Sequence, residues 1–106
     1  FEAQKGGYSK IKEGNSADNV HRAVVEVFKK YKMEKYFIHS TGHGLGLELH
    51  EAPRIPSPIK FKAGMVITNE PGLYVQGIGG VRIEDTLVVT KDGFEILTKV
   101  KKEFVV

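Results

Sequence analysis

Residues 39–53 read HSTGHGLGLELHEAP, and this segment decides both the fold and the chemistry that we expect of the chain. It is rich in glycine, which allows close backbone packing and positive φ angles. It also carries three of the four histidines, namely His39, His43 and His50. Two carboxylates follow in distinctive settings, Glu70 in ITNEPGLY and Glu84 in GGVRIEDT. Because imidazole and carboxylate together suit a hard-to-borderline divalent metal ion, we expect the chemistry to depend on His43, Glu70 and Glu84.

Residues 44–51, within this segment, show the alternation that is typical of a β-strand. Leucines would occupy one face, and small or polar residues, His50 among them, would occupy the other. His43 falls on the leucine side of this alternation, so a regular strand would point His43 and His50 to opposite faces. A bulge or loop at residues 42–46 is therefore required if both histidines serve one site.

Two helices are predicted upstream of this segment. Residues 1–13 contain tolerable helix formers, although the glycines at positions 6–7 cost about 1 kcal/mol each relative to alanine. Asn15 or Ser16 can cap a second helix. Its apolar residues recur at helical spacing and predict one buried stripe: Val20, Ala23, Val24, Val27, Phe28 and Tyr31. His21 lies outside the stripe and is interpreted as a surface histidine.

The rest of the chain is predicted to form a connector and an antiparallel sheet. Prolines predict a stiff, irregular connector over residues 52–60. The later segments are predicted as a strand over 65–70 ended by a Pro-Gly pair, a glycine-rich loop over 77–80, a long strand over 81–90, a turn at 91–93, a returning strand over 94–97 and an edge strand at 104–106. Two helices followed by an antiparallel sheet make the fold class α+β.

The composition is that of an ordinary globular chain. Its 106 residues form one domain or part of one, and its net charge of +3 is mild. The scattered lysines indicate a solvated basic face rather than a nucleic-acid footprint. The absence of cysteine excludes disulfides and thiolate ligands and fits a reducing cytoplasm. No apolar run reaches the ~20 residues of a membrane span, and no signal-peptide pattern opens the chain.

Each candidate residue could instead have a purely structural role. A lone histidine or glutamate on a strand is more often a hydrogen-bonded structural residue than a metal ligand. Glu84 lies in an otherwise apolar strand, where an unpaired carboxylate is costly. Either it pairs with Arg82 or Lys91, or a cation neutralises it. The chain has no His-Glu-x-x-His helix. Three ligands can hold a catalytic zinc ion, but two carboxylates with one histidine fit a carboxylate-rich dinuclear centre better.

Three sequence blocks together resemble a known family. HSTGHGLGLELHEAP, TNEPGLY and GGVRIEDT, which fall within residues 37–90, resemble the C-terminal signature blocks of the pita-bread metallopeptidases. That group includes prolidase, aminopeptidase P, methionine aminopeptidase and creatinase. Leu47 stands where methionine aminopeptidases tend to have arginine, so the resemblance is to prolidase or aminopeptidase P. It implies that residues 1–106 form the C-terminal part of the catalytic domain, about half of the fold, with helices packed on a curved antiparallel sheet.

The resemblance also implies a role for each candidate residue. His43, Glu70 and Glu84 would be ligands of two divalent metal ions, manganese, cobalt or zinc, with Glu84 bridging them. Glu70 would also act as the general base for the attacking water. The remaining roles belong to residues around the substrate: His50 would stabilise the tetrahedral intermediate, His39 would line the pocket for the residue after the scissile bond, Arg82 would orient Glu84, and Arg54 would contact a substrate carboxylate.

The activity that the resemblance implies is hydrolysis of Xaa-Pro bonds in a proline-containing peptide or dipeptide, as a dipeptidase or an aminopeptidase. In this family two aspartates from an upstream hairpin complete the metal site, and Asp18, Asp85 and Asp92 do not fit that role. The chain begins with Phe1 rather than methionine. We therefore expect a piece of a longer protein that is inactive and binds metal weakly without the missing N-terminal half of the fold.

Two rival functions follow from the same sequence. A relative that kept the fold but lost the metal would be a pita-bread module that binds peptides or proteins. The intact set of His43, His50, Glu70 and Glu84 favours the enzyme, because a dead site has no need of it. A basic nucleic-acid-binding domain is disfavoured by the absence of an aromatic-basic motif. The resemblance leaves a homodimer open as the assembly.

Overall fold

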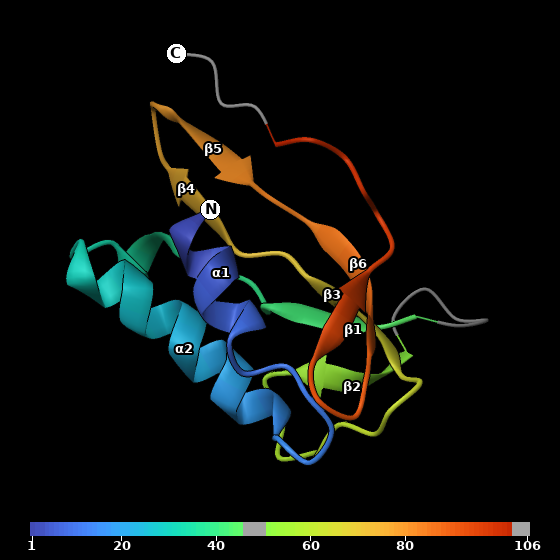
Figure 1. Ribbon diagram of the computed structural model, residues 1–106. Helices are drawn as coiled ribbons and strands as arrows, with labels where there is room; N and C mark the ends of the chain where they lie inside the picture. The colour runs from blue at the N-terminus through green and yellow to red at the C-terminus, as the bar shows by residue number, and fades with distance from the viewer. Residues whose placement is uncertain (46–50, 103–106) are drawn as a thin grey trace.

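The computed structural model describes residues 1–45 and 51–102, and their order is two helices followed by strands. The helical elements are α1 (Glu2–Tyr8), α2 (Ala17–Lys30) and the 3-10 turn η1 (Glu34–Tyr36). The strands are β1 (Gly42–Gly44), β2 (Glu51–Ile55), β3 (Val66–Asn69), β4 (Gly72–Val75), β5 (Gly79–Arg82), β6 (Asp85–Val89) and β7 (Phe94–Ile96). The α+β class predicted from the sequence is confirmed (Figure 1).

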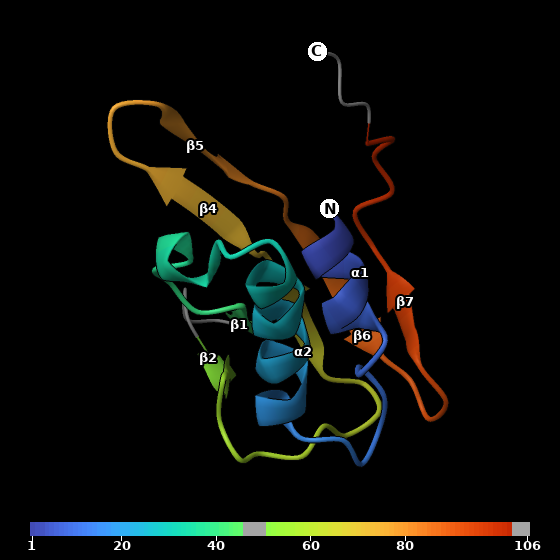
Figure 2. The ribbon, with the colours of Figure 1, turned by 90° about the vertical axis from the view of Figure 1, so that its left-hand side faces the viewer.

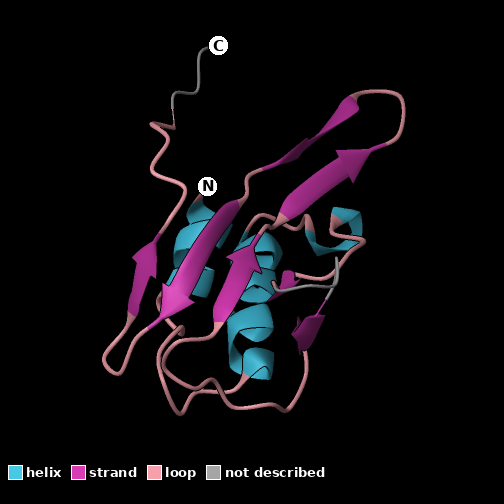
Figure 3. Cartoon of the chain, turned by 90° about the vertical axis from the view of Figure 1, so that its right-hand side faces the viewer, coloured by secondary structure: helices cyan, strands magenta, loops and turns pink. Residues whose placement is uncertain are grey.

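The main sheet is antiparallel and has the strand order β2-β1-β3-β6-β7. Strands β4 and β5 form a separate hairpin that extends away from it. Two opposite views show α1 and α2 side by side on one face of the main sheet (Figures 2 and 3). The other face is the one on which the candidate residues gather.

Helix α2 forms where the apolar stripe predicts it. The side chain of Ser16 accepts a hydrogen bond from the backbone N–H of Asn19, which satisfies one of the unpaired donors of the first turn. Val20, Val24 and Phe28 are buried, but Tyr31 at the end of the stripe is 53% exposed. The helix ends at Lys30, and Tyr31 is its C-cap residue.

Helix α1 is shorter than the predicted helix over residues 1–13, because it ends at Tyr8. The glycines that weaken it allow it to pack tightly. A Cβ on Gly7 would lie 3.0 Å from both the Asn69 Oδ1 atom and a methyl group of Val24. Helix α1 therefore approaches both α2 and the end of β3 more closely than a helix with larger residues could.

Several strand predictions need correction. Residues 51–55 form the strand β2 rather than an irregular connector, and Pro53 is tolerated because β2 is at the edge of the sheet. The glycine-rich loop predicted over 77–80 contains the start of β5, which pairs with β4 as a hairpin. The long strand predicted over 81–90 is interrupted at residues 83–84, so β5 and β6 belong to different sheets.

Other strand predictions hold. The strand predicted over 65–70 is β3, and the turn at 91–93 joins β6 to β7. The register of β1 shifts relative to β2 between His43 and Gly44. This shift lies within residues 42–46, where a bulge or loop was predicted on the condition that His43 and His50 serve one site. The predicted edge strand at 104–106 lies outside the described residues, and so does most of the leucine-rich alternation.

The core lies between the helices and the main sheet. Its buried members come from α2 and from the loops and strands that face it: Ile11, Ala17, Val20, Ile55, Phe61, Ile67, Leu87 and Val89. Their alternation along β3 and β6 leaves the intervening side chains of these strands on the opposite face. Across the described ranges 1–45 and 51–102, no helix has the length and apolar character to traverse a bilayer.

Candidate metal centre

The register of β3 and β6 brings the two candidate glutamates together. Asn69 is paired with Asp85 at the end of this antiparallel ladder. Glu70 follows Asn69 and Glu84 precedes Asp85, so the same register places the two glutamates opposite each other. Because successive residues on a strand point to opposite faces, both carboxylates leave the face that α1 covers. The backbone N–H of Glu70 also donates to the Thr41 carbonyl at 2.6 Å, which ties it to the segment before β1.

His43 reaches the same place from β1. A Cβ on the preceding residue, Gly42, would lie 1.9 Å from the Thr68 carbonyl oxygen, so only glycine allows β1 to approach β3 this closely. The backbone N–H of His43 donates to Thr68 Oγ1 at 3.1 Å. The His43 Nδ1 atom lies 2.9 Å from the Gly44 carbonyl, which can only accept. In the neutral ring Nδ1 therefore carries the proton, and Nε2 carries the lone pair that a metal ion would accept.

The three candidate ligands converge. His43, Glu70 and Glu84 each offer one ligand atom, and these atoms all lie within 4.8 Å of one another. The His43 Nε2 atom is 3.6 Å from the Glu70 Oε2 atom, and both side chains are mostly buried, at 17% and 15% exposed. This Glu70 oxygen is buried without a hydrogen-bond partner among the residues that the structure describes. Such an oxygen is costly to leave unpaired.

Burial and a neighbouring carboxylate both disfavour the ionised form of Glu84. Partial burial raises the pKa of Glu84, and the hydrogen bond and negative charge of Glu70 raise it further. Arg82 and His43 oppose this rise but do not cancel it. The Arg82 Nε atom is 3.8 Å from the Glu84 Oε1 atom, and both side chains are substantially exposed. Arg82 is therefore only a weak counter-charge for Glu84. A divalent cation would offset the repulsion between the adjacent carboxylates of Glu70 and Glu84 and favour their ionised forms.

A cavity of about 520 Å³ opens in front of these groups. It is lined by His39, Ser40, Gly42, His43, Arg54, Glu70 and Arg82. Arg54 lies on β2, opposite His43 in the ladder. The His39 Nδ1 atom donates to the Ser40 carbonyl at 2.7 Å, so in the neutral ring Nε2 accepts from the Tyr74 hydroxyl at 3.1 Å.

The structure places most of the predicted site residues around one cavity. His39, His43, Arg54, Glu70 and Arg82 line it, and Glu84 lies within ligand distance of His43 and Glu70. Their roles stay predictions. His50 lies outside the described residues. Asp85 faces away from Glu84, as expected, and is buried on the helix side.

One prediction about a histidine was wrong, and two polar contacts were missed. His21 was predicted to be a surface histidine but is half-buried: its Nδ1 atom lies 2.7 Å from Thr41 Oγ1 and its ring packs near Phe37. Sequence reasoning did not single out Thr41, although it stands two residues from His43. Tyr74 was also missed, although it ends the TNEPGLY block that contains Glu70.

The cavity and the convergent imidazole and carboxylates together define a candidate metal centre, and sequence comparison gives the family of the chain. The model of metallopeptidase family M24 matches residues 1–91, so the chain belongs to family M24. The chain is 48% identical over 105 residues to the Xaa-Pro dipeptidase of Pyrococcus furiosus, and the match covers 97% of this chain and 30% of that protein. The chain thus spans about 30% of the length of the curated relatives it matches.

Solved structures agree with this family. Prolidase from Pyrococcus furiosus superposes with a TM-score of 0.91 at 48% identity, covering 95% of this chain and 31% of the prolidase. An X-Pro aminopeptidase from Thermotoga maritima superposes with a TM-score of 0.92 at 35% identity, covering 96% of this chain and 30% of the aminopeptidase. The fold therefore matches part of the prolidase pita-bread fold, as the sequence blocks indicated.

Proposed function

We propose that this chain supplies the C-terminal part of a catalytic domain that hydrolyses Xaa-Pro peptide bonds with divalent metal ions. The observation that carries the proposal is the convergence of His43, Glu70 and Glu84, whose ligand atoms lie within 4.8 Å of one another beside a cavity. Membership of family M24 and similarity to an Xaa-Pro dipeptidase support the same reaction class.

The donor set fits the proposed metal ions. One imidazole nitrogen and two carboxylates suit manganese, cobalt or zinc, and the chain has no cysteine that would favour a thiolate site. The buried Glu70 oxygen without a hydrogen-bond partner among the described residues is where a cation would be bound. When bound, such ions lower the pKa of water and polarise the scissile carbonyl group.

The residues of the chain then have distinct tasks. Glu70 accepts the proton of the attacking water, because its carboxylate is buried beside the cavity. Arg82 lies close enough to Glu84 to orient it. His39 is fixed by Tyr74 and Ser40 and lines the wall where the residue after the scissile bond would lie. His50 and Arg54 keep their proposed contacts to the intermediate and to a substrate carboxylate.

Two of the proposed metal ligands lie outside the chain. We propose that two aspartate ligands come from another segment of the complete protein, since the described residues group only His43, Glu70 and Glu84 at metal-binding distances. The chain alone is then expected to bind metal weakly and to be inactive.

The test compares substrates and variants in the complete protein that carries this chain. Wild type loaded with Mn²⁺ or Co²⁺ is expected to hydrolyse an Xaa-Pro dipeptide or release the residue ahead of proline from a longer peptide. Glu70→Gln is expected to lower kcat by about 10²–10⁴-fold, because it removes the general base. Glu95→Gln is the matched control, since Glu95 is an exposed glutamate on β7.

Loss of activity in Glu70→Gln with unchanged activity in Glu95→Gln would support the proposal. A wild-type protein that binds no divalent metal, yet captures proline-containing peptides without cleaving them, would overturn it in favour of the binding module.

A further inference from the structure

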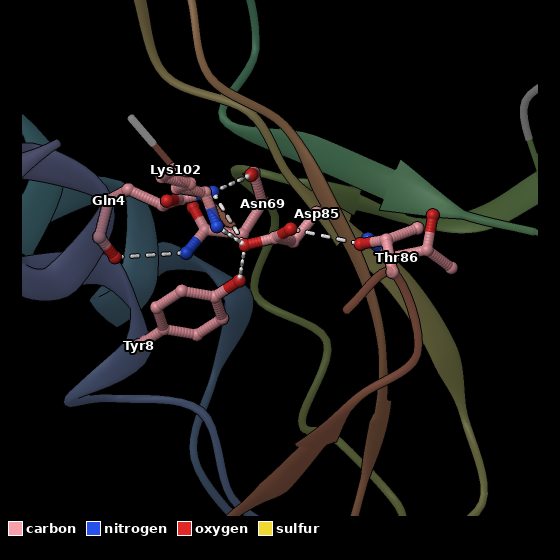
Figure 4. Close-up of polar contacts among 7 residues, drawn as sticks. Gln4, Tyr8, Asn69, Asp85, Thr86 and Lys102 are labelled. Carbon is pink, nitrogen blue, oxygen red and sulfur yellow. Dashed lines mark hydrogen bonds and ion pairs between the residues drawn. The ribbon is translucent and has the colours of Figure 1, made fainter. Parts of the chain in front are cut away.

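A buried polar cluster lies between α1 and the main sheet (Figure 4). By the alternation of β3 and β6, it lies on the opposite face of the sheet from the candidate ligands. At its centre is Asp85, which is only 2% exposed. Its Oδ2 atom accepts from the Tyr8 hydroxyl at 2.6 Å, from Gln4 Nε2 at 3.2 Å and from the Lys102 ammonium group. Its Oδ1 atom accepts from the Thr98 hydroxyl at 2.9 Å.

Gln4 joins this carboxylate to the neighbouring strand. Besides its bond to Asp85, the Gln4 Nε2 atom donates to the Asn69 carbonyl at 3.1 Å. The side chain of Asn69, which is fully buried, donates in return to the Gln4 carbonyl at 3.0 Å. One residue of α1 therefore bridges the last residue of β3 and the first residue of β6.

These two bridged residues are the sequence neighbours of the glutamate ligands. Asn69 and Asp85 face each other at the end of the ladder, and Glu70 and Glu84 lie just beyond it, outside any strand. The backbone of Glu84 lies between Asp85, the first residue of β6, and Ile83, whose N–H donates to the Pro71 carbonyl at 3.2 Å. Glu70 has a backbone hydrogen bond to Thr41, but on its other side it also depends on Asn69.

We propose that Asp85, held by Gln4 and Tyr8, is a positioning residue that keeps Glu70 and Glu84 side by side for the metal ions. The inference rests on the proposed metal function. Two like-charged carboxylates repel each other, so without metal the ends of β3 and β6 would tend to separate. The hydrogen bonds of Asp85 on the helix side oppose that separation, and they preset the carboxylate spacing that a metal ion requires.

The experiment measures metal binding as well as activity in the complete protein. Asp85→Asn keeps the size of the side chain but presents an amide donor to a cluster of donors. It is expected to weaken Co²⁺ binding by about 10–100-fold in a competition titration and to change the visible absorption spectrum of bound Co²⁺. Tyr8→Phe removes one donor to Asp85. It is expected to weaken Co²⁺ binding by a smaller factor and to change the Co²⁺ spectrum less than Asp85→Asn does.

Two control variants separate positioning from general stability. Tyr31→Phe removes a tyrosine–carboxylate hydrogen bond of the same kind, but this bond joins Tyr31 to the exposed Glu2. Val20→Ala opens a cavity in the buried core of α2 and lowers the melting temperature. Both are expected to keep the affinity and spectrum of wild type.

Each outcome has one meaning. Weaker Co²⁺ binding in Asp85→Asn and Tyr8→Phe, with both controls unchanged, supports the inference. Wild-type affinity and spectrum in folded Asp85→Asn and Tyr8→Phe overturn it and leave the proposed function intact. If Asp85→Asn does not fold, Tyr8→Phe decides by the same criteria. A wild-type protein that binds no Co²⁺ overturns the proposed function and the inference with it.

Discussion

His43 shows which part of a site a sequence can predict at the scale of a single residue. The spacing of histidine and glycine predicts the residue type and its chemistry. The tautomer depends on the carbonyl of Gly44, which lies at the register shift between His43 and Gly44. A backbone irregularity of this kind has no side-chain signature, so the sequence could predict that a bulge was needed but not which ring nitrogen would face the carboxylates.

Gly42 is the residue on which the position of His43 most depends. Replacing it by alanine forces a Cβ to within 1.9 Å of the Thr68 carbonyl oxygen unless the strands move apart. We expect Gly42→Ala to lower the free energy of unfolding by about 1–3 kcal/mol, as overpacking does, and to weaken metal binding through His43. Denaturant unfolding and Co²⁺ titration of the complete protein measure the two effects.

Gly93→Ala is the control for this substitution, since a Cβ there meets nothing within 4 Å. Its free energy of unfolding is expected to stay within about 0.5 kcal/mol of wild type. Equal stability and metal affinity in the Gly42 and Gly93 variants would show that β1 does not need its close approach to β3.

At the scale of elements, helix α2 and strand β3 were predictable because one strong periodic pattern specifies each of them. Strand β6 was predicted only as part of a longer strand over 81–90. The hairpin of β4 and β5 was not predictable, since its strands carry glycines and exposed apolar side chains such as Val81. Strand β2 was missed because its proline suggests a break, although an edge strand accepts one. The cluster around Asp85 could not be predicted from the sequence. Its hydrogen bonds from Gln4 reach residues that are 65 and 81 positions away along the chain.

His21 links α2 to the segment before β1, and its titration gives a pH-dependent prediction. Burial lowers the pKa of His21 below its ordinary value, and the charge of Asp18 only partly opposes this. Between that lowered pKa and the unfolded value of about 6.5, the unfolded chain binds more protons. The stability from neutral His21 is therefore present above about pH 6.5 and lost as the pH falls through the folded pKa.

The variant that tests this is His21→Asn, which can still hydrogen-bond to Thr41 but does not titrate. Denaturant unfolding at several pH values is expected to show a steeper loss of stability on the acid side for wild type than for the variant. Above about pH 7.5 the two should follow parallel curves. Identical slopes across the acid range would contradict the prediction.

At the scale of the whole molecule, the chain spans about 30% of the length of its curated relatives, yet it brings together three candidate ligands from three separate segments. The sequence predicted these ligands because their chemistry is local to short motifs. It could not give their mutual distance, which depends on the register of β3 and β6 and on how closely β1 approaches β3.

The most direct test is a crystal structure of the complete protein grown with Zn²⁺, with anomalous scattering measured at the zinc absorption edge. We predict an anomalous peak about 2.0–2.2 Å from the His43 Nε2 atom and from carboxylate oxygens of Glu70 and Glu84. Zinc bound at other residues, with none of these three side chains in contact with it, would contradict the account.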